Sequence, residues 1–198
     1  MPKIVDKVAK REEILQAALR AFAKKGFNYT KMDDVAREAG IGKGTIYEYF
    51  RSKSDLLRAA YENYLEETYR QTFAILKSAR SPLEKIREII LSIIRYYSRD
   101  PAIMRVFFDF WIESTHSGQQ PAIDFKKIYA DYRDIAQTLL KQAQNQGQVR
   151  KNLPANTPSV LVAVIEGTFL QWIIDPDAFD MNDMAEAIVD VVLGGLRA

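Results

Sequence analysis

Apolar residues recur along the chain at intervals of three and four positions, which is the spacing of one face of an α-helix. Between about Val8 and Lys25, such a stripe is formed by Ile14, Ala17, Ala18, Ala21 and Phe22. The period-two alternation that is typical of half-buried strands is scarce. The pattern therefore predicts an all-α protein.

Residues that begin and end helices divide the chain into about nine helices. Gly26 suits the left-handed position after the first helix, and Thr30, with Asp33 three residues later, predicts the start of a second. Gly40-Ile41-Gly42 breaks that helix, and a third short helix is expected over about 43–49. Further helices are expected over about 52–79, 81–99, 102–115, 123–146 and 157–174, and from Asp180 or Asn182 onwards.

A short helix, a glycine turn and a second short helix, braced by a longer one, is the arrangement of a helix-turn-helix. Ile46 and Phe50 lie four residues apart and should face inward. The other positions of the third helix are polar, small or hydroxyl-bearing, which suits insertion into the DNA major groove. The open alternative is a helical hairpin with an ordinary polar surface. The candidate DNA contacts are Lys43, Gly44, Thr45, Tyr47, Tyr49 and Lys53.

The charge distribution agrees with a polyanionic partner at this end of the chain. Residues 1–58 carry 13 Lys/Arg against 8 Asp/Glu, a net charge of +5, while the remainder carries 15 against 18, a net −3. The sum is the formal +2 of the whole chain. A basic segment attached to a near-neutral body indicates a polyanionic partner at that end, with a solvated mixed-charge surface as the alternative.

The stretch from Ile14 to Leu57 closely resembles the DNA-binding domain of the TetR/AcrR family of bacterial regulators. The matching residues are Ile14-Leu15-x-Ala17-Ala18, Phe22-Ala23-x-x-Gly26-Phe27, Lys31-Met32-Asp33-Asp34-Val35-Ala36, Ala39-Gly40-Ile41-Gly42-Lys43-Gly44-Thr45-Ile46-Tyr47-Glu48-Tyr49-Phe50 and Lys53-x-Asp55-Leu56-Leu57. The resemblance implies that the six candidates above face DNA, with Lys53 on a phosphate. It also implies that Thr30 both caps the second helix and approaches the DNA backbone.

The expected architecture is an N-terminal three-helix helix-turn-helix domain, residues 1–58 with the motif at 31–50. It is continuous with a larger C-terminal helical bundle, residues 59–198, for effector binding and dimerisation. Aromatic residues cluster in the larger part, and ligand sites in bundles lie between helices. We expect a mostly apolar small-molecule effector there, with a filled core as the alternative. The pocket candidates are Tyr97, Phe107, Phe110, Trp111, Tyr132 and Phe169.

One polar group lies on a face of the sixth expected helix. Asp109, Glu113 and His116 stand at i, i+4 and i+7. Glu-x-x-His at this spacing binds metal in some bundles, but a polar effector contact or a solvated stripe is equally compatible. We expect no metal site and no cofactor.

Two strongly apolar helices at the C-terminal end predict a homodimer. The alternative is that both helices complete the core of a monomer. A two-fold dimer would place two recognition helices about 34–36 Å apart on one face of DNA. The expected interface residues are Leu161, Ile165, Phe169, Trp172, Ile188, Val189, Val192 and Leu196.

The sequence therefore predicts a ligand-responsive regulator, a repressor that binds a palindromic operator in double-stranded DNA as a homodimer. An effector-independent architectural DNA-binding protein is the main alternative. A helical-bundle enzyme has little support, because the chain has no cysteine, one histidine and no glycine-rich phosphate loop. No run approaches the roughly 20 apolar residues of a membrane span, and the polar start indicates no export signal. We expect a cytoplasmic protein without a membrane partner.

Overall fold

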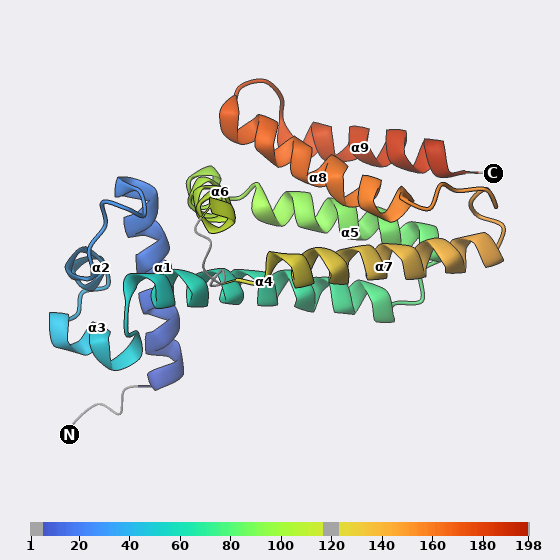
Figure 1. Cartoon of the computed structure of the whole chain (residues 1–198). Coiled ribbons are helices and arrows are strands. Elements are labelled where there is room, and N and C mark those ends of the chain that lie inside the picture. Colours follow the sequence, from blue (N-terminus) through green and yellow to red (C-terminus); the bar gives the residue numbers. More distant parts are fainter. Residues whose placement is uncertain (1–5, 117–122, 198) are drawn as a thin grey trace. The chain divides into compact units, whose positions relative to one another are not determined.

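The computed structural model describes residues 6–116 and 123–197. Within these ranges, the side chains of residues 113–116 are not described. Nine helices and no strand occur in these ranges, which confirms the all-α prediction (Figure 1). The helices are α1 (Lys7–Lys25), α2 (Met32–Glu38), α3 (Lys43–Tyr49), α4 (Lys53–Lys77), α5 (Pro82–Tyr97), α6 (Pro101–His116), α7 (Phe125–Asn145), α8 (Thr157–Ile174) and α9 (Met181–Leu196).

Local side-chain chemistry sets several of the helix ends. The Asp6 carboxylate accepts hydrogen bonds from the backbone N–H groups of Val8 and Ala9 at the start of α1. Ser81 and Glu84 form a capping box before α5, in which each side chain accepts a bond from the other's backbone N–H. Asp180 is the N-cap of α9. These ends follow from contacts within four residues; the sequence predicted the start at Ser81 and left Asp180 and Asn182 as alternatives for α9, while the Asp6 cap was not predicted.

The start of α2 differs from the prediction. Its N-cap is Lys31, and the Asp34 carboxylate accepts a 2.9 Å hydrogen bond from the backbone N–H of Lys31. The expected box of Thr30 with Asp33 was therefore wrong by one residue. Thr30 is 1% exposed, and its hydroxyl donates to the carbonyl oxygen of Gly26 at 2.7 Å, with that of Ala21 at 3.3 Å. The side chain is thus used to hold the end of α1.

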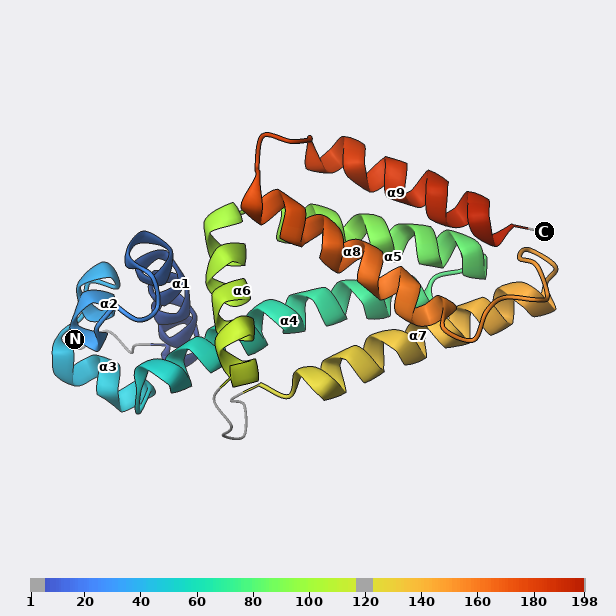
Figure 2. The same cartoon turned by 45° about the horizontal axis from the view of Figure 1, so that its top comes forward.

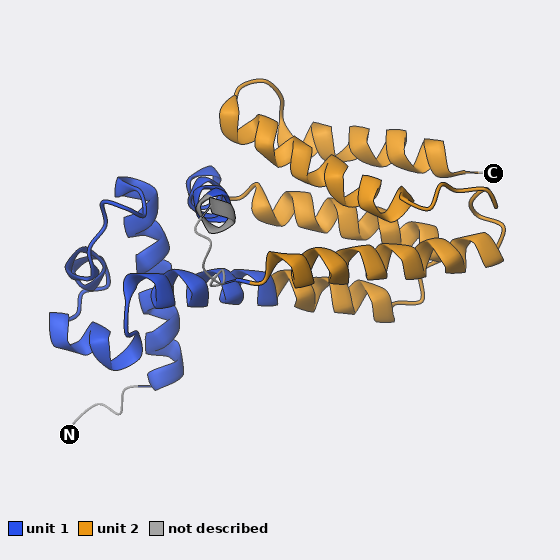
Figure 3. Ribbon diagram, viewed as in Figure 1, with its two compact units in different colours: residues 1–66, 100–123 blue, residues 67–99, 124–198 orange. Residues whose placement is uncertain are grey.

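The helices form two compact units (Figure 3). The first contains α1 to α3, the part of α4 up to Glu66, and α6, which packs against α1. The second contains the remainder of α4 together with α5, α7, α8 and α9. This division differs from the expected boundary after residue 58, because α6 lies far along the sequence yet joins the helix-turn-helix.

The core of the first unit holds the recognition helix in place. The α1 face that the apolar stripe predicts is buried, and α2 packs against both α1 and α3. Ile46 and Phe50 are 0% and 2% exposed, so their predicted inward orientation is confirmed. Burial of one side of α3 leaves its other side for solvent or a partner.

The second unit is a helical bundle in which α5 packs against α7 and α9, and α7 packs against α8 (Figure 2). By length and composition alone, α8 is apolar enough to cross a membrane, with a mean hydropathy of 1.5. Only 39% of it is buried within this structure. An apolar face of α8 is therefore left uncovered by its own unit.

Candidate functional site

The exposed side of α3 carries most of the residues that the sequence predicts to face DNA. Lys43, Gly44 and Tyr47 are exposed, while Thr45 and Tyr49 are half-buried. A Cβ atom added at Gly44 would meet nothing within 4 Å. The surface at Gly44 is therefore open, which would allow close approach of a DNA strand.

The turn between α2 and α3 sets the angle at which this surface is presented. Gly40 has a φ of 64°, a conformation that residues with a Cβ rarely adopt. The backbone N–H of Ile41 donates to the carbonyl oxygen of Ala36 at 2.9 Å, and the Ile41 side chain is half-buried. Glycine is thus required in this turn for a reason of backbone geometry.

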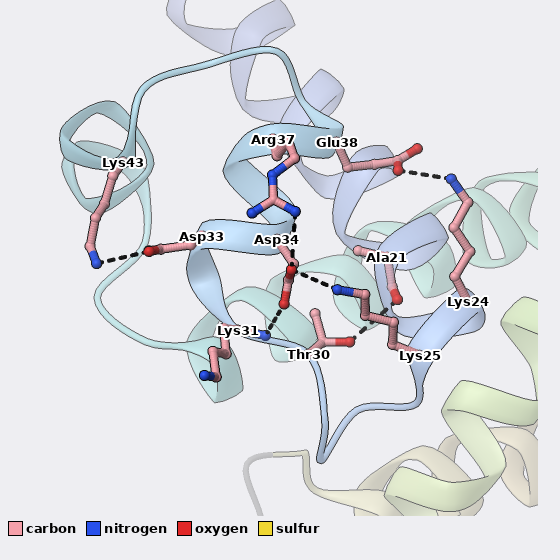
Figure 4. A network of polar contacts seen from close by, with 10 residues as sticks. All are labelled: Ala21, Lys24, Lys25, Thr30, Lys31, Asp33, Asp34, Arg37, Glu38 and Lys43. Atoms are coloured by element: carbon pink, nitrogen blue, oxygen red, sulfur yellow. Dashed lines mark hydrogen bonds and ion pairs between the residues drawn. The ribbon is translucent and has the colours of Figure 1, made fainter.

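Carboxylates of α2 attach this helix to α1 (Figure 4). Asp34 pairs with Lys25 at 2.7 Å, and Glu38 pairs with Lys24 at 2.8 Å and with Arg20 at 3.0 Å. Hydrogen bonds from these bases lower the pKa of the Asp34 and Glu38 carboxyls below their ordinary values. Sequence reasoning did not identify these pairs, because several bases of α1 lie at compatible positions.

The third carboxylate of α2, that of Asp33, lies close to the recognition helix instead. Its Oδ2 is 2.9 Å from Nζ of Lys43, and both side chains are largely exposed (Figure 4). The hydrogen bond from Lys43 to Asp33 favours the charged ammonium and raises the pKa of Lys43. A predicted DNA-contacting lysine is therefore already paired with a carboxylate in the free protein.

Lys53 has a structural contact that the sequence did not reveal. Its Nζ donates to the carbonyl oxygens of Phe27 at 2.6 Å and Asn28 at 3.2 Å, and it lies 4.4 Å from the centroid of the Phe27 ring. The first residue of α4 thus holds the turn between α1 and α2. An ammonium has three N–H donors, so one remains available for a phosphate.

The six candidate pocket residues divide between the two units. In the first unit, Phe107 and Phe110 are buried. The Phe107 ring lies 4.8 Å from that of Tyr61, and the Phe110 ring lies 6.3 Å from that of Phe27. Trp111 is half-buried beside Phe108. Phe110 therefore packs against the same α1–α2 turn that Lys53 holds.

The other three candidates belong to the second unit. The Tyr97 ring is 5.7 Å from the Phe169 ring, and the Thr68 hydroxyl donates to the Tyr97 oxygen at 3.3 Å. Burial raises the pKa of Tyr97 to about 12, so this phenol is neutral at physiological pH. Tyr132 lies 6.1 Å from Tyr69, ring to ring. Thr68 is buried and was not among the sequence candidates, because a lone threonine in a helix carries no signal.

A groove of about 430 Å³ opens on the second unit but does not involve these aromatic residues. It is lined by Ser81, Leu83, Glu84, Arg87, Gly147, Gln148, Leu193 and Arg197. Five of these eight residues are polar or charged, and none of them is a pocket candidate from the sequence.

Six of the eight residues expected at a dimer interface are buried within their own unit. They are Leu161, Phe169, Trp172, Ile188, Val189 and Leu196. Ile165 and Val192 are half-buried. These six residues are only 3–7% exposed, so they offer little surface to a second copy, and their place in an interface stays a prediction. Because α8 is apolar on nearly every side, sequence periodicity could not show which side faces inward.

The exposed apolar residues of the same two helices form a different stripe. Val160, Ala163, Gly167, Leu170 and Ile174 are spaced by three or four residues along α8, and all but the half-buried Gly167 are exposed. On α9, Ala187, Val191 and Gly194 follow the same spacing and are exposed. Ile174 and Val191 are 74% and 76% exposed. We call these eight residues the α8–α9 stripe.

Of the three polar residues on one face of α6, the structure describes the side chain of the first only. Asp109 is exposed, whereas the side chains of Glu113 and His116 lie outside the described residues. In the part of the chain that the structure describes, no group of three or more His, Cys, Asp or Glu side chains is placed to hold a metal ion.

Two family models match the chain, and together they cover both parts of it. Residues 14–60 match the model described as bacterial regulatory proteins, tetR family. Residues 82–196 match the model of the BetI-type transcriptional repressor C-terminal domain. The second match covers more than half of the chain, including α5 to α9.

Individual relatives agree with these matches. The HTH-type transcriptional regulator TtgR of Pseudomonas putida is 29% identical, over 94% of this chain and 91% of its own. The fold is shared with FadR from Bacillus subtilis in complex with stearoyl-CoA (TM-score 0.77, 21% identity, 94% and 99% of the two chains). It is also shared with the SmeT–triclosan complex (TM-score 0.80, 21% identity, 96% and 92%). An all-helical chain with this helix-turn-helix and this C-terminal domain belongs to the TetR family of bacterial transcriptional regulators, which are not enzymes.

Proposed function

We propose that this protein is a homodimeric repressor that binds a palindromic operator and is released by a mostly apolar small molecule. The observation that carries the DNA-binding half is the exposed side of α3 above its buried anchors Ile46 and Phe50. Operator DNA lies in the bacterial cytoplasm, so we place the protein there.

On this proposal, the exposed and half-buried polar residues of α3 divide between base edges and phosphates. Lys43 and Thr45 read base edges in the major groove, because an ammonium suits guanine acceptors and threonine offers a hydroxyl and a methyl group. Tyr47 and Tyr49 donate to phosphates, which position the protein without reading sequence. Lys53 adds a phosphate contact through its remaining N–H. Thr30 is left out because its hydroxyl is buried and bonded within the first unit.

The α8–α9 stripe is the proposed dimer interface. Its apolar members repeat along two neighbouring helices, and Gly167 and Gly194 would let helix backbones approach closely. Pairing of the same face in two copies gives a closed two-fold dimer. This interface takes the place of the buried residues that the apolar pattern of the two helices predicts.

The proposed effector is apolar and contacts the aromatic side chains around Tyr97 and Phe169. Two proteins of the same fold form complexes with stearoyl-CoA and with triclosan, both of which have large apolar parts. An effector shifts a two-state equilibrium only if it binds the states with different affinity. Its contacts must therefore differ between the DNA-binding and the released form.

The experiment that tests the DNA-binding half is selection of tight binders from random double-stranded DNA. A Lys43→Ala, Tyr47→Ala double variant is the control, because both side chains are exposed and neither belongs to the core. Recovery of an inverted repeat that the control loses would support a dimeric operator-binding protein. Recovery of AT-rich DNA without symmetry would favour an architectural protein instead.

The effector is tested with the operator that the selection yields. Triclosan and stearoyl-CoA are added at increasing concentration while operator binding is followed by fluorescence anisotropy. The proposal expects at least one apolar compound to weaken operator binding. In a Phe169→Ala variant, the concentration of that compound that releases half of the operator should differ from the wild-type value. If a broad panel of apolar compounds never weakens binding, the protein acts without an effector, although its DNA binding stands.

A further inference from the structure

The recognition helix carries a lysine that is paired within the protein before any DNA arrives. Lys43 is the first residue of α3, and its Nζ lies 2.9 Å from Oδ2 of Asp33 on α2. The two side chains remain 67% and 48% exposed, so the pair lies on the open surface of the helix-turn-helix. Any DNA that reaches Lys43 therefore also approaches the Asp33 carboxylate.

Asp33 differs from the other two carboxylates of α2. Asp34 and Glu38 bind bases of α1, and Asp34 also accepts the backbone N–H of Lys31. Among the described residues, the Asp33 carboxylate pairs with Lys43 alone. Figure 4 shows Asp33 directed away from α1 and toward Lys43. Attachment of α2 to α1 therefore does not require Asp33.

We propose that Asp33 is a specificity-determining residue, which directs Lys43 toward base edges and away from phosphates. The inference rests on the proposed DNA-binding function of α3. An ammonium has three donors, so Lys43 can keep its bond to Asp33 while donating to the neutral O6 and N7 acceptors of a guanine. A phosphate bound by the same ammonium would lie next to the carboxylate, and the two anions would repel each other.

This arrangement weakens non-specific binding more than operator binding. Non-specific affinity comes almost entirely from contacts with phosphates, whereas base contacts provide discrimination. A carboxylate that disfavours one phosphate contact therefore raises the ratio of operator affinity to random-sequence affinity. Asp33 would increase specificity although it touches no base.

The test compares four proteins: the wild type, Asp33→Asn, Lys43→Gln and the double variant. Binding to the selected operator and to a random-sequence duplex of equal length is measured by fluorescence anisotropy over a range of salt concentrations. We expect Asp33→Asn to tighten binding to the random duplex about two- to fivefold, the range for releasing an exposed ion pair. The salt slope for that duplex should steepen by about one, because the freed lysine neutralises one more phosphate. Operator affinity should change less.

In the Lys43→Gln background, Asp33→Asn should no longer alter the ratio of the two affinities. A Glu48→Gln variant removes the same charge from the exposed surface of α3 and controls for net charge. The proposal is overturned if Asp33→Asn tightens binding to the random duplex equally with and without Lys43. It is also overturned if Glu48→Gln lowers the ratio of operator to random-duplex affinity as much as Asp33→Asn does. If the wild type selects no operator, the proposed function fails; the random-duplex measurements then still test whether Asp33 disfavours a phosphate contact of Lys43, because that effect needs no operator.

Discussion

Lys53 and Thr30 show how one side chain can serve the fold at a position where sequence suggested a DNA contact. Lys53 holds two carbonyl oxygens of the α1–α2 turn and lies over the Phe27 ring. Thr30 is buried in the same turn, with its hydroxyl bonded to the end of α1. Both residues stabilise the short connection from which α2 begins, so their substitution should affect folding as well as binding.

Replacement of Lys53 by Met tests its two roles together. Met keeps an unbranched apolar side chain but removes the ammonium, so we expect a loss of about 1–2 kcal/mol in the free energy of unfolding. Affinity should fall by the same factor for operator and random DNA, and the salt slope should decrease by about one. Urea unfolding and anisotropy measure these quantities, with the exposed Lys31→Met as control. A changed base preference would contradict this assignment.

Thr30→Val removes the buried hydroxyl at nearly constant shape. The carbonyl oxygen of Gly26 then keeps only the 3.2 Å bond from the Thr30 backbone N–H, so we expect a destabilisation of about 0.5–1.5 kcal/mol, the net contribution of one hydrogen bond. Thr30→Ser keeps the hydroxyl and should retain most of the stability. Thermal unfolding of the two variants gives the comparison. A fully stable Thr30→Val protein that has lost only DNA affinity would restore Thr30 as a DNA contact.

At the scale of elements, α2 depends on ion pairs with α1 as well as on its apolar side. Both helices present charged residues at the contact, and Glu38 bridges Lys24 and Arg20. A helix of seven residues has little stability alone, so tertiary contacts must keep it in place. The orientation of the recognition helix therefore depends on the ionisation of these carboxylates.

This dependence predicts acid sensitivity of the first unit. The pKa of Glu38 is lowered in the folded protein from its ordinary value of 4.5, so the unfolded chain binds more protons between the two values. The stabilisation is complete above the ordinary pKa and is lost as the pH falls through the lowered one. Tm measured from pH 6 to pH 3 should fall less steeply for Glu38→Gln. If Tm falls equally steeply with pH in the wild type and in Glu38→Gln, the ion pairs of Glu38 do not cause the acid sensitivity.

At the scale of the whole molecule, the α8–α9 stripe is an exposed apolar surface of the second unit. The residues that the sequence marked as most apolar in these helices complete the bundle core, and the remaining apolar side chains are exposed. Exposed apolar residues that repeat on two neighbouring helices are typical of an interface. Operator binding by two recognition helices requires such a pairing of subunits.

Replacement of Leu170 and Val191 by Arg tests this interface. Two charges on each copy would face the partner without pairing, which costs several kcal/mol in association. We expect sedimentation to report a monomer that keeps its helical circular dichroism and has lost the inverted-repeat operator. Phe73→Arg, at an exposed apolar residue of α4 outside the stripe, is the matched control. A dimeric double variant would place the interface elsewhere.

The sequence was informative wherever structure depends on near neighbours. The helix ends at Gly26, Ser81 and Asp180 are determined by side chains and backbone groups within about four residues. The inward orientation of Ile46 and Phe50 follows from helical periodicity combined with a spaced motif. These features need no information about distant parts of the chain.

Only the tertiary structure decided the choices between chemically similar options. Asp33 and Asp34 are adjacent carboxylates, yet one pairs with α3 and the other with α1. Apolar residues surround α8, so periodicity alone could not separate the buried Phe169 from the exposed Ile174. The sequence by itself determined the helices, most of their ends and the family, because these depend on local spacing. The partners and the exposed faces depend on which of several equivalent atoms the fold brings within contact distance.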